Sequence, residues 1–197
     1  MLLATLVVIL TERCSNRVIP DERLAIDPRF LSLFNSIVQK DTIRFRSQSG
    51  HNKTFVITNV DSVINNKKAL VLNRRPYKML RATFDEDGFN TLLQRENQIE
   101  VGKDAESLVS GLTIQFNNLY FGDTTLPLLH HDTLDLNNKR FTSYYIFETS
   151  LALNNPDDVR ILYVSVLNGF MGFRTLSGEI WVNERECLAD ESFLRSR

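Results

Sequence analysis

The chain has 197 residues, of which 43% are hydrophobic and 24% charged, and its formal net charge is −1. This length and composition are typical of one globular domain with a buried core, and they exclude a disordered chain or one that spans membranes throughout. A nucleic-acid partner normally requires a basic face, so the near-neutral charge argues against nucleic acid as a partner. The thirteen Phe residues, set against eight Gly, predict a packed aromatic core.

The chain opens with an apolar run of nine residues, Leu2–Leu10, which is soon followed by Cys14. The run is shorter than the roughly 20 apolar residues that a transmembrane helix needs, and it matches the apolar region of an export signal. We therefore interpret residues 1–16 as an export or lipoprotein-like signal segment, with Cys14 as the residue expected to be lipidated. The alternative is an N-terminal strand buried in the sheet, because residues 11–13 (TER) replace the small residues that a lipoprotein signal places before its cysteine.

The chain has two cysteines, Cys14 and Cys187. If Cys14 carries a lipid, Cys187 remains as a lone thiol. If the N-terminal segment is retained after export, the two cysteines could instead form a disulfide. The sequence leaves both possibilities open.

Residues 17–29 contain two prolines and mixed charges. We interpret them as a tether that leads to a single β-rich domain over residues 30–197. A short helix is predicted near Asp27–Lys40, with Asp27 as its N-cap and Pro28 at its first position. Apolar residues then recur at spacings of three and four, which places them on one helix face that packs on a sheet: Phe30, Leu31, Phe34, Ile37 and Val38.

The next segments alternate with the period of two that is typical of half-buried strands. Thr42–Arg46 and Lys53–Asp61 predict a hairpin that turns at Gly50. A further strand is predicted around Arg81. It belongs to a stretch without acidic residues that contains six basic ones: Lys67, Lys68, Arg74, Arg75, Lys78 and Arg81. This stretch could bind an anion, but acidic residues follow at once, so we interpret its charges as a solvated face.

The middle of the chain predicts less regular structure. Helical spacing in residues 87–93 indicates one or two helical turns, and Leu112–Phe116 alternates as a half-buried strand. We expect residues 117–125 to form a loop in which Tyr120 and Phe121 are possible exposed aromatics.

His130, His131 and Asp132 form the one cluster that could bind a metal or transfer protons. Adjacent histidines project in different directions, and a zinc site usually needs three or four ligands. The segment follows a proline and has turn chemistry, so a surface turn is the simpler interpretation. No metal, cofactor or catalytic residue is assigned, and the common motifs for nucleophilic, zinc or phosphate chemistry are missing. Carboxylate catalysis stays open, because paired acids leave no local signature.

The C-terminal part is the richest in strand formers. Lys139–Ser150 has apolar residues on both faces and predicts a central strand. Val159–Glu184 predicts three antiparallel strands, which are joined at Asn168-Gly169 and Ser177-Gly178, dipeptides that favour tight turns. In the last of these strands, alternation places Ile180 and Val182 on one face and Trp181 on the other.

Three features of the chain carry a family likeness: an apolar leader that ends at Cys14-Ser15-Asn16, the strand pattern Asp41–Phe45, and the closely spaced segment Gly169–Glu179. With them the chain resembles small exported lipoproteins of Bacteroidetes-type bacteria. The resemblance implies a periplasmic or outer-membrane location, and it implies no catalytic residues.

The predicted fold is mainly β: an antiparallel sandwich or a strongly curved, partly closed sheet of roughly eight to ten strands with a short N-terminal helix. The predicted function is a non-catalytic binding or assembly module of the cell envelope, exported and anchored to the membrane through Cys14. The first alternative is a carrier that encloses an apolar ligand or lipid inside the curved sheet. The second is a hydrolase that uses carboxylates or the His130/His131 pair. The protein or small-molecule partner is not defined by the sequence.

Overall fold

The computed structural model of the protein describes residues 21–39, 42–65, 77–86, 97–104, 109–117, 119–149, 151 and 153–184. These residues form a 3-10 helix η1 (Asp21–Leu24), one α-helix α2 (Pro28–Val38) and the strands β1 (Thr42–Ser47), β2 (Asn52–Asn65), β3 (Tyr77–Glu86), β4 (Asn97–Asp104), β5 (Ser110–Phe116), β6 (Leu119–Asp123), β7 (Leu134–Leu136), β8 (Lys139–Phe141), β9 (Tyr144–Glu148), β10 (Val159–Ser165), β11 (Gly169–Thr175) and β12 (Ile180–Asn183). The predicted mainly β fold with a short N-terminal helix is confirmed.

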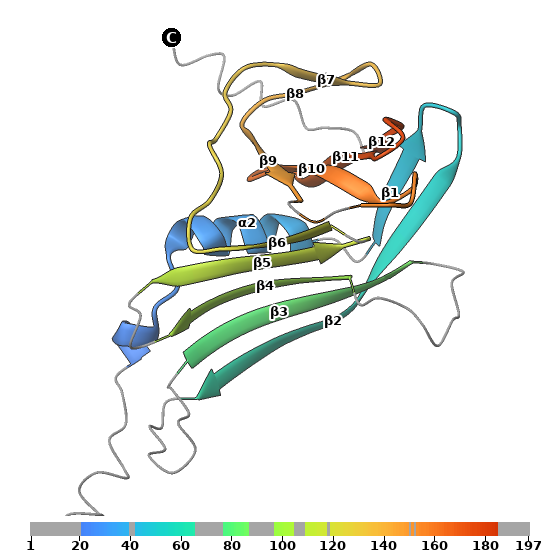
Figure 1. Ribbon diagram of the computed structural model, residues 1–197. Helices are drawn as coiled ribbons and strands as arrows, with labels where there is room; N and C mark the ends of the chain where they lie inside the picture. The colour runs from blue at the N-terminus through green and yellow to red at the C-terminus, as the bar shows by residue number, and fades with distance from the viewer. Residues whose placement is uncertain are drawn as a thin grey trace, which may run out of the picture.

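Ten strands form one antiparallel sheet in the order β6-β5-β4-β3-β2-β1-β12-β11-β10-β9. The sheet is strongly curved and its two end strands approach each other (Figure 1). Phe121 of β6 meets Phe147 of β9 edge to face, with 4.8 Å between the ring centroids. In addition, the Val159 amide donates a hydrogen bond to the Asn117 carbonyl over 3.2 Å. The sheet is therefore nearly closed and barrel-like, the second of the two predicted arrangements.

The long strand β2 joins the two halves of the curved sheet. Its first residues pair with β1, and its remaining length pairs with β3. An irregularity in the β2–β3 register lies between Ile57 and Asn59. Because a bulge bends a strand and increases its twist, this position helps the sheet to curve.

Helix α2 lies along the inside of the curve (Figure 1) and packs against β4, β5 and β11. Its start is as predicted: the Asp27 side chain accepts a hydrogen bond from the Arg29 amide over 2.8 Å, and Pro28 occupies the first turn. Its apolar face is buried, as the spacing predicted, through Phe30, Leu33, Phe34 and Ile37.

Aromatic side chains fill the space enclosed by the sheet. Phe116 of β5 is fully buried, and its ring lies 4.8 Å from Phe55, 5.3 Å from Phe170, 5.7 Å from Phe173 and 6.1 Å from Phe45, measured between centroids. These rings come from β1, β2, β5 and β11, so they join both halves of the sheet. The aromatic core predicted from the composition is confirmed.

A second, smaller core lies on the other face of the C-terminal strands. The β7–β8 hairpin covers that face with Leu136 and Phe141 (Figure 1). These two pack with Tyr144, Tyr163, Met171 and Val182. The cover explains why β9 to β12 are apolar on both sides. It also confirms the predicted alternation, since Trp181 belongs to the large core and Val182 to the small one.

Two predicted elements are wrong in detail. Lys139–Ser150 does not form one central strand, because Ser143, with a positive φ of 56°, separates β8 from β9, and β9 lies at an end of the strand order. Residues 117–125 do not form a loop, because Asn117, with φ 40°, reverses the chain and β6 then pairs with β5. Tyr120 is half exposed, whereas Phe121 packs on the core.

The segment 17–29 was expected to be a tether, and the structure describes residues 21–29 of it. There Leu24 is fully buried and Ile26 is 5% exposed. The packed domain therefore includes these residues rather than beginning at residue 30. Three predicted features lie outside the described residues: the helical turns at 87–93, Cys14 and Cys187.

Candidate functional site

The candidate site is a groove at the N-terminal end of α2, formed by two adjoining cavities. One has a volume of about 490 Å³ and the other of about 610 Å³. Arg29 and Thr124 line both, so the two cavities meet at these residues. We call their combined surface the α2 groove.

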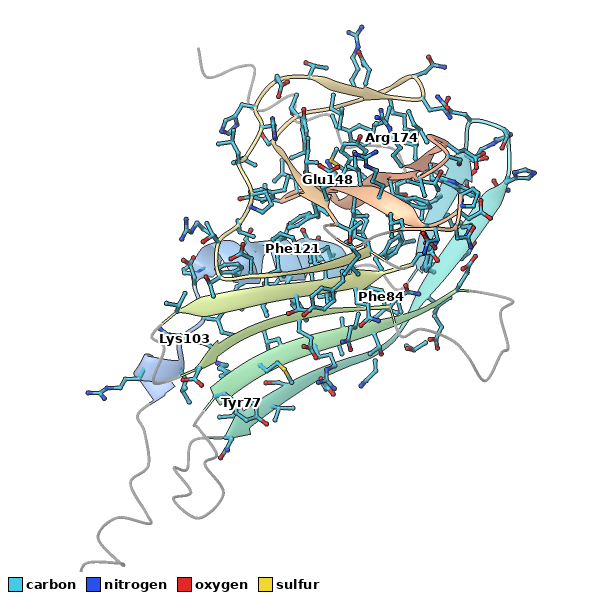
Figure 2. All side chains as sticks on the ribbon, in the orientation of Figure 1. Tyr77, Phe84, Lys103, Phe121, Glu148 and Arg174 are labelled. Atoms are coloured by element: carbon cyan, nitrogen blue, oxygen red, sulfur yellow. The ribbon has the colours of Figure 1, made fainter. Side chains whose placement is uncertain are left out.

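The smaller cavity lies between the start of α2 and the ends of β4 and β5. Its wall includes the apolar residues Ile26, Phe30 and Val109, with Lys103 of β4 beside them. Lys103 lies at the same end of the sheet as the N-terminus of α2 (Figure 2). The Asp27 amide donates a hydrogen bond to the Ser110 hydroxyl over 2.8 Å, which fixes the helix start to β5.

The larger cavity lies beside residues 124–129, which follow β6. The Asp123 carboxylate accepts hydrogen bonds from the amides of Thr124 and Thr125, over 2.6 and 3.1 Å, and so turns the chain away from the strand. Leu126 and Leu129 then pack on the core, whereas Leu128 is 76% exposed. Tyr145 of β9 also lines this cavity.

Arg29 and Asp27 set the charge at the centre of the groove. The Arg29 guanidinium donates to both carboxylate oxygens of Asp27, with a shortest distance of 2.8 Å from Nη2 to Oδ2. This hydrogen bond, together with the one from the Arg29 amide, lowers the pKa of Asp27. Lys103 acts on Asp27 in the same direction. Among the described residues that line the groove or set its charge, two are cations and one is a carboxylate.

Tyr145 is the buried polar residue of the groove. It is 6% exposed, and burial raises the pKa of its hydroxyl, while the nearby Arg29 charge opposes that shift. Among the described residues, none makes a hydrogen bond with this hydroxyl. The groove can therefore bind an acceptor group through Tyr145 and Arg29, and an apolar group along residues 126–129.

The predicted cluster at residues 130–132 is in part a packed turn. His130 forms a backbone bridge with Tyr144, and its ring stacks on the Tyr144 ring with centroids 5.1 Å apart. The Tyr144 hydroxyl donates to Asp132 over 3.2 Å, whereas His131 is exposed. The two histidines thus do not converge on a common point, and the stacking supports a structural role for His130.

A second polar cluster joins two hairpin turns, and the sequence did not indicate it. The Ser49 hydroxyl donates to Glu179 and lies 3.0 Å from Nδ1 of His51. The hydrogen bond from Ser49 lowers the pKa of Glu179. His51 and Glu179 both contact the same hydroxyl, so they do not form a relay in which an acid orients a base toward a serine.

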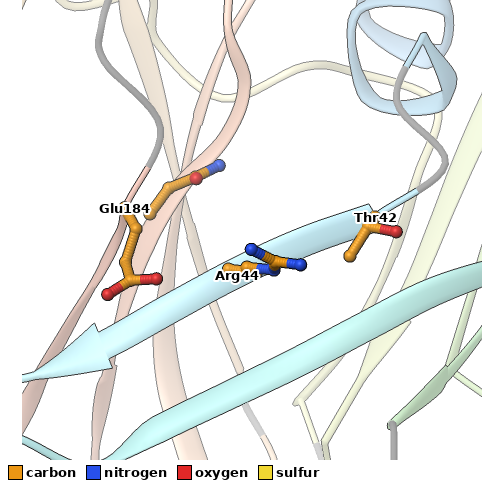
Figure 3. Close-up of a pocket in the computed structure, with 4 residues that line it drawn as sticks. Thr42, Arg44 and Glu184 are labelled. Carbon is orange, nitrogen blue, oxygen red and sulfur yellow. The ribbon is translucent and has the colours of Figure 1, made fainter.

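A third cavity, of about 340 Å³, lies where β1 meets the end of β12 (Figure 3). Its described lining residues are all polar: Thr42, Arg44, Asn183 and Glu184. Since small-molecule sites are mostly apolar with a few polar groups, the α2 groove is the better candidate.

Of the predicted basic stretch, the structure describes only Lys78 and Arg81, both in β3. Arg81 forms an ion pair with Glu100 of β4. This pairing agrees with the interpretation of a solvated, charge-balanced strand face rather than an anion site.

In the part of the chain that the structure describes, no three His, Cys, Asp or Glu side chains are grouped so that they could hold a metal ion. None of the helices described is long and apolar enough to cross a membrane. No protein family matches the chain, and comparisons with curated proteins and with solved structures give no match.

Proposed function

We propose that the protein is an exported, non-catalytic binding module of the cell envelope, anchored through a lipid on Cys14, and that the α2 groove is its ligand site. The observation that carries the proposal is the combination of an apolar wall with the charged and hydroxyl groups of Arg29, Lys103 and Tyr145. A groove of this size and mixed lining is typical of a site for a small ligand.

The two alternatives are less well supported. A carrier requires space inside the sheet, and that space is occupied by the aromatic rings around Phe116. A hydrolase requires an acid and a base that converge on a substrate. His130 stacks on Tyr144 instead, and His131 points to no partner among the described residues.

The proposal is tested on protein purified from the envelope of its source and analysed by native and intact mass spectrometry. We expect acyl chains on Cys14 and a retained non-covalent ligand. In the variant Thr124→Trp, the new side chain occupies the junction of the two cavities, so the retained ligand should be lost. Thr133→Trp, at an exposed position outside the groove, is the matched control and should keep it.

Each part of the proposal has its own contrary result. An intact mass without acyl chains, two protons below that of the reduced chain, would show a disulfide and exclude the lipid anchor. Equal retention in Thr124→Trp and wild type would place the ligand outside the groove. A wild-type protein that retains nothing from the envelope would overturn the binding function.

A further inference from the structure

We infer that the ligand of the α2 groove is an amphipathic monocarboxylate, whose carboxylate lies between Arg29 and the Tyr145 hydroxyl and whose apolar chain follows Leu126 to Leu129. This inference rests on the proposed function, since it assigns a chemical class to the ligand of the same groove. The location of the ligand distinguishes this inference from the carrier alternative, because the groove lies at the end of the sheet and not in its packed interior.

Tyr145 provides the strongest argument. Tyr145 lines the larger cavity and is 6% exposed as a residue, and none of the described residues bonds to its hydroxyl, which is open to the cavity. A ligand acceptor would satisfy it. The phenol is protonated at neutral pH, as any tyrosine is, and burial raises its pKa further, so it acts as the donor.

Arg29 determines the charge of the acceptor. Its Nε and Nη2 atoms are engaged by Asp27, and the described residues make no hydrogen bond to Nη1. The guanidinium can therefore donate one further hydrogen bond to an anion. Since Asp27 already offsets much of its charge, the pair suits a single negative charge better than a phosphate dianion, which favours multiple or bidentate cationic contacts.

The chain segment after β6 provides the apolar part. Leu126, Pro127, Leu128 and Leu129 all line the larger cavity, and Leu128 is 76% exposed there. An exposed leucine beside a nearly buried tyrosine gains free energy when an apolar ligand covers it, at about 25 cal/mol for each Å² of apolar surface removed from water. The volume of about 610 Å³ lies within the range of small-molecule sites.

The test is titration calorimetry of the full chain with dodecanoate at pH 8, below its micellar concentration, with dodecanol and dodecyl phosphate as comparison ligands. We expect dodecanoate to bind at least about tenfold more tightly than dodecanol, as a charge-assisted hydrogen bond would give. Dodecyl phosphate should bind more weakly than dodecanoate. Equal affinity for dodecanoate and dodecanol, or tighter binding of the phosphate, would overturn the inference.

Two variants locate the carboxylate. Tyr145→Phe removes the hydroxyl and keeps the ring, and Arg29→Gln removes the charge. Each should weaken dodecanoate binding by about five- to tenfold while leaving dodecanol unchanged. Tyr120→Phe and Arg140→Gln are the matched controls, because both residues are exposed and lie outside the groove lining. Thermal unfolding of all four variants checks that they fold.

The outcomes separate this inference from the proposed function. If dodecanoate does not bind but Thr124→Trp still loses a ligand retained from the envelope, only the chemical class is wrong. If Tyr145→Phe and Arg29→Gln bind dodecanoate like the wild type, the carboxylate position is wrong. A chain that neither binds dodecanoate nor retains an envelope ligand contradicts both.

Discussion

At the scale of single residues, Gly169 and Gly178 have the same role in the sequence but different surroundings in the structure. Both close hairpins with positive φ, at 69° and 90°. A Cβ on Gly169 would lie 2.5 Å from the Ser36 carbonyl oxygen of α2, whereas a Cβ on Gly178 would meet no atom within 4 Å. Gly169 therefore allows both the turn and the close approach of the β10–β11 turn to the helix.

We expect Gly169→Val to lower the free energy of unfolding by about 3 kcal/mol or more, because backbone strain adds to a clash with a helix backbone. Gly178→Val should cost only about 1–2 kcal/mol, which is the strain of a left-handed conformation alone. Urea denaturation of both variants provides the measurement. Equal losses of unfolding free energy in the two variants would mean that the close approach to α2 does not restrict which residue position 169 can hold.

At the scale of elements, Asp27 links the start of α2 to the groove. The carboxylate caps the helix and holds Arg29, and these hydrogen bonds lower its pKa from the ordinary value of 3.8. A carboxyl group with a lowered pKa in the folded state stabilises the fold above its ordinary pKa, and this contribution is lost as the pH falls through the folded-state pKa. Acid should therefore weaken the cap only below about pH 4.

We expect Asp27→Ala to reduce the free energy of unfolding at pH 7 by about 1 kcal/mol, as for other N-cap losses. The difference from wild type should shrink as the pH is lowered from 5 to about 2, since the wild-type carboxylate is then protonated. Denaturation curves at several pH values measure this. Asp135→Asn removes an exposed carboxylate that pairs with Arg140 on the β7–β8 hairpin, and it serves as the control. A difference that is constant over this pH range would contradict the assigned role of the charge.

Elements that depend on local chemistry could be predicted, and those that depend on distant partners could not. The cap at Asp27, the turns at Gly50, Gly169 and Gly178, and the alternation around Trp181 each follow from a few neighbouring residues. Strand β6 was not predicted, because the chain reverses at Asn117 in a left-handed conformation before β6 pairs with β5. Asparagine tolerates that conformation but does not require it, so the sequence alone does not indicate the turn.

At the scale of the whole molecule, the sequence predicted a curved antiparallel sheet, but it did not predict that the two end strands of the sheet approach each other. Whether the end strands meet depends on contacts such as Phe121 with Phe147, which are distant in sequence. The α2 groove was not predicted for the same reason. Its main polar groups, Arg29, Lys103 and Tyr145, come from three separate elements, and none belongs to a motif. Of the basic and histidine patterns in the sequence, Arg81 is explained by its ion pair with Glu100 and His130 by its stacking on Tyr144.

The same arrangement predicts that stability is distributed unequally between the interior and the line where the sheet closes. Phe116 is fully buried and contacts rings from both halves of the sheet, so Phe116→Ala should cost about 3–5 kcal/mol. Phe121 is partly buried and its ring contact is with Phe147 across the closing strands. Phe121→Ala should therefore cost less, about 1–2 kcal/mol, which corresponds to partial burial of an aromatic side chain.

Hydrogen exchange distinguishes these two losses in a way that total stability does not. In Phe121→Ala we expect faster amide exchange in β6 and β9, because local opening there no longer breaks an aromatic contact, while β1 and β11 keep their protection. In Phe116→Ala the exchange of all core strands should rise together, since their protection is limited by global unfolding. If Phe121→Ala instead raised exchange uniformly, the contact between β6 and β9 would be as important to the fold as the interior, and the sheet would behave as a closed structure.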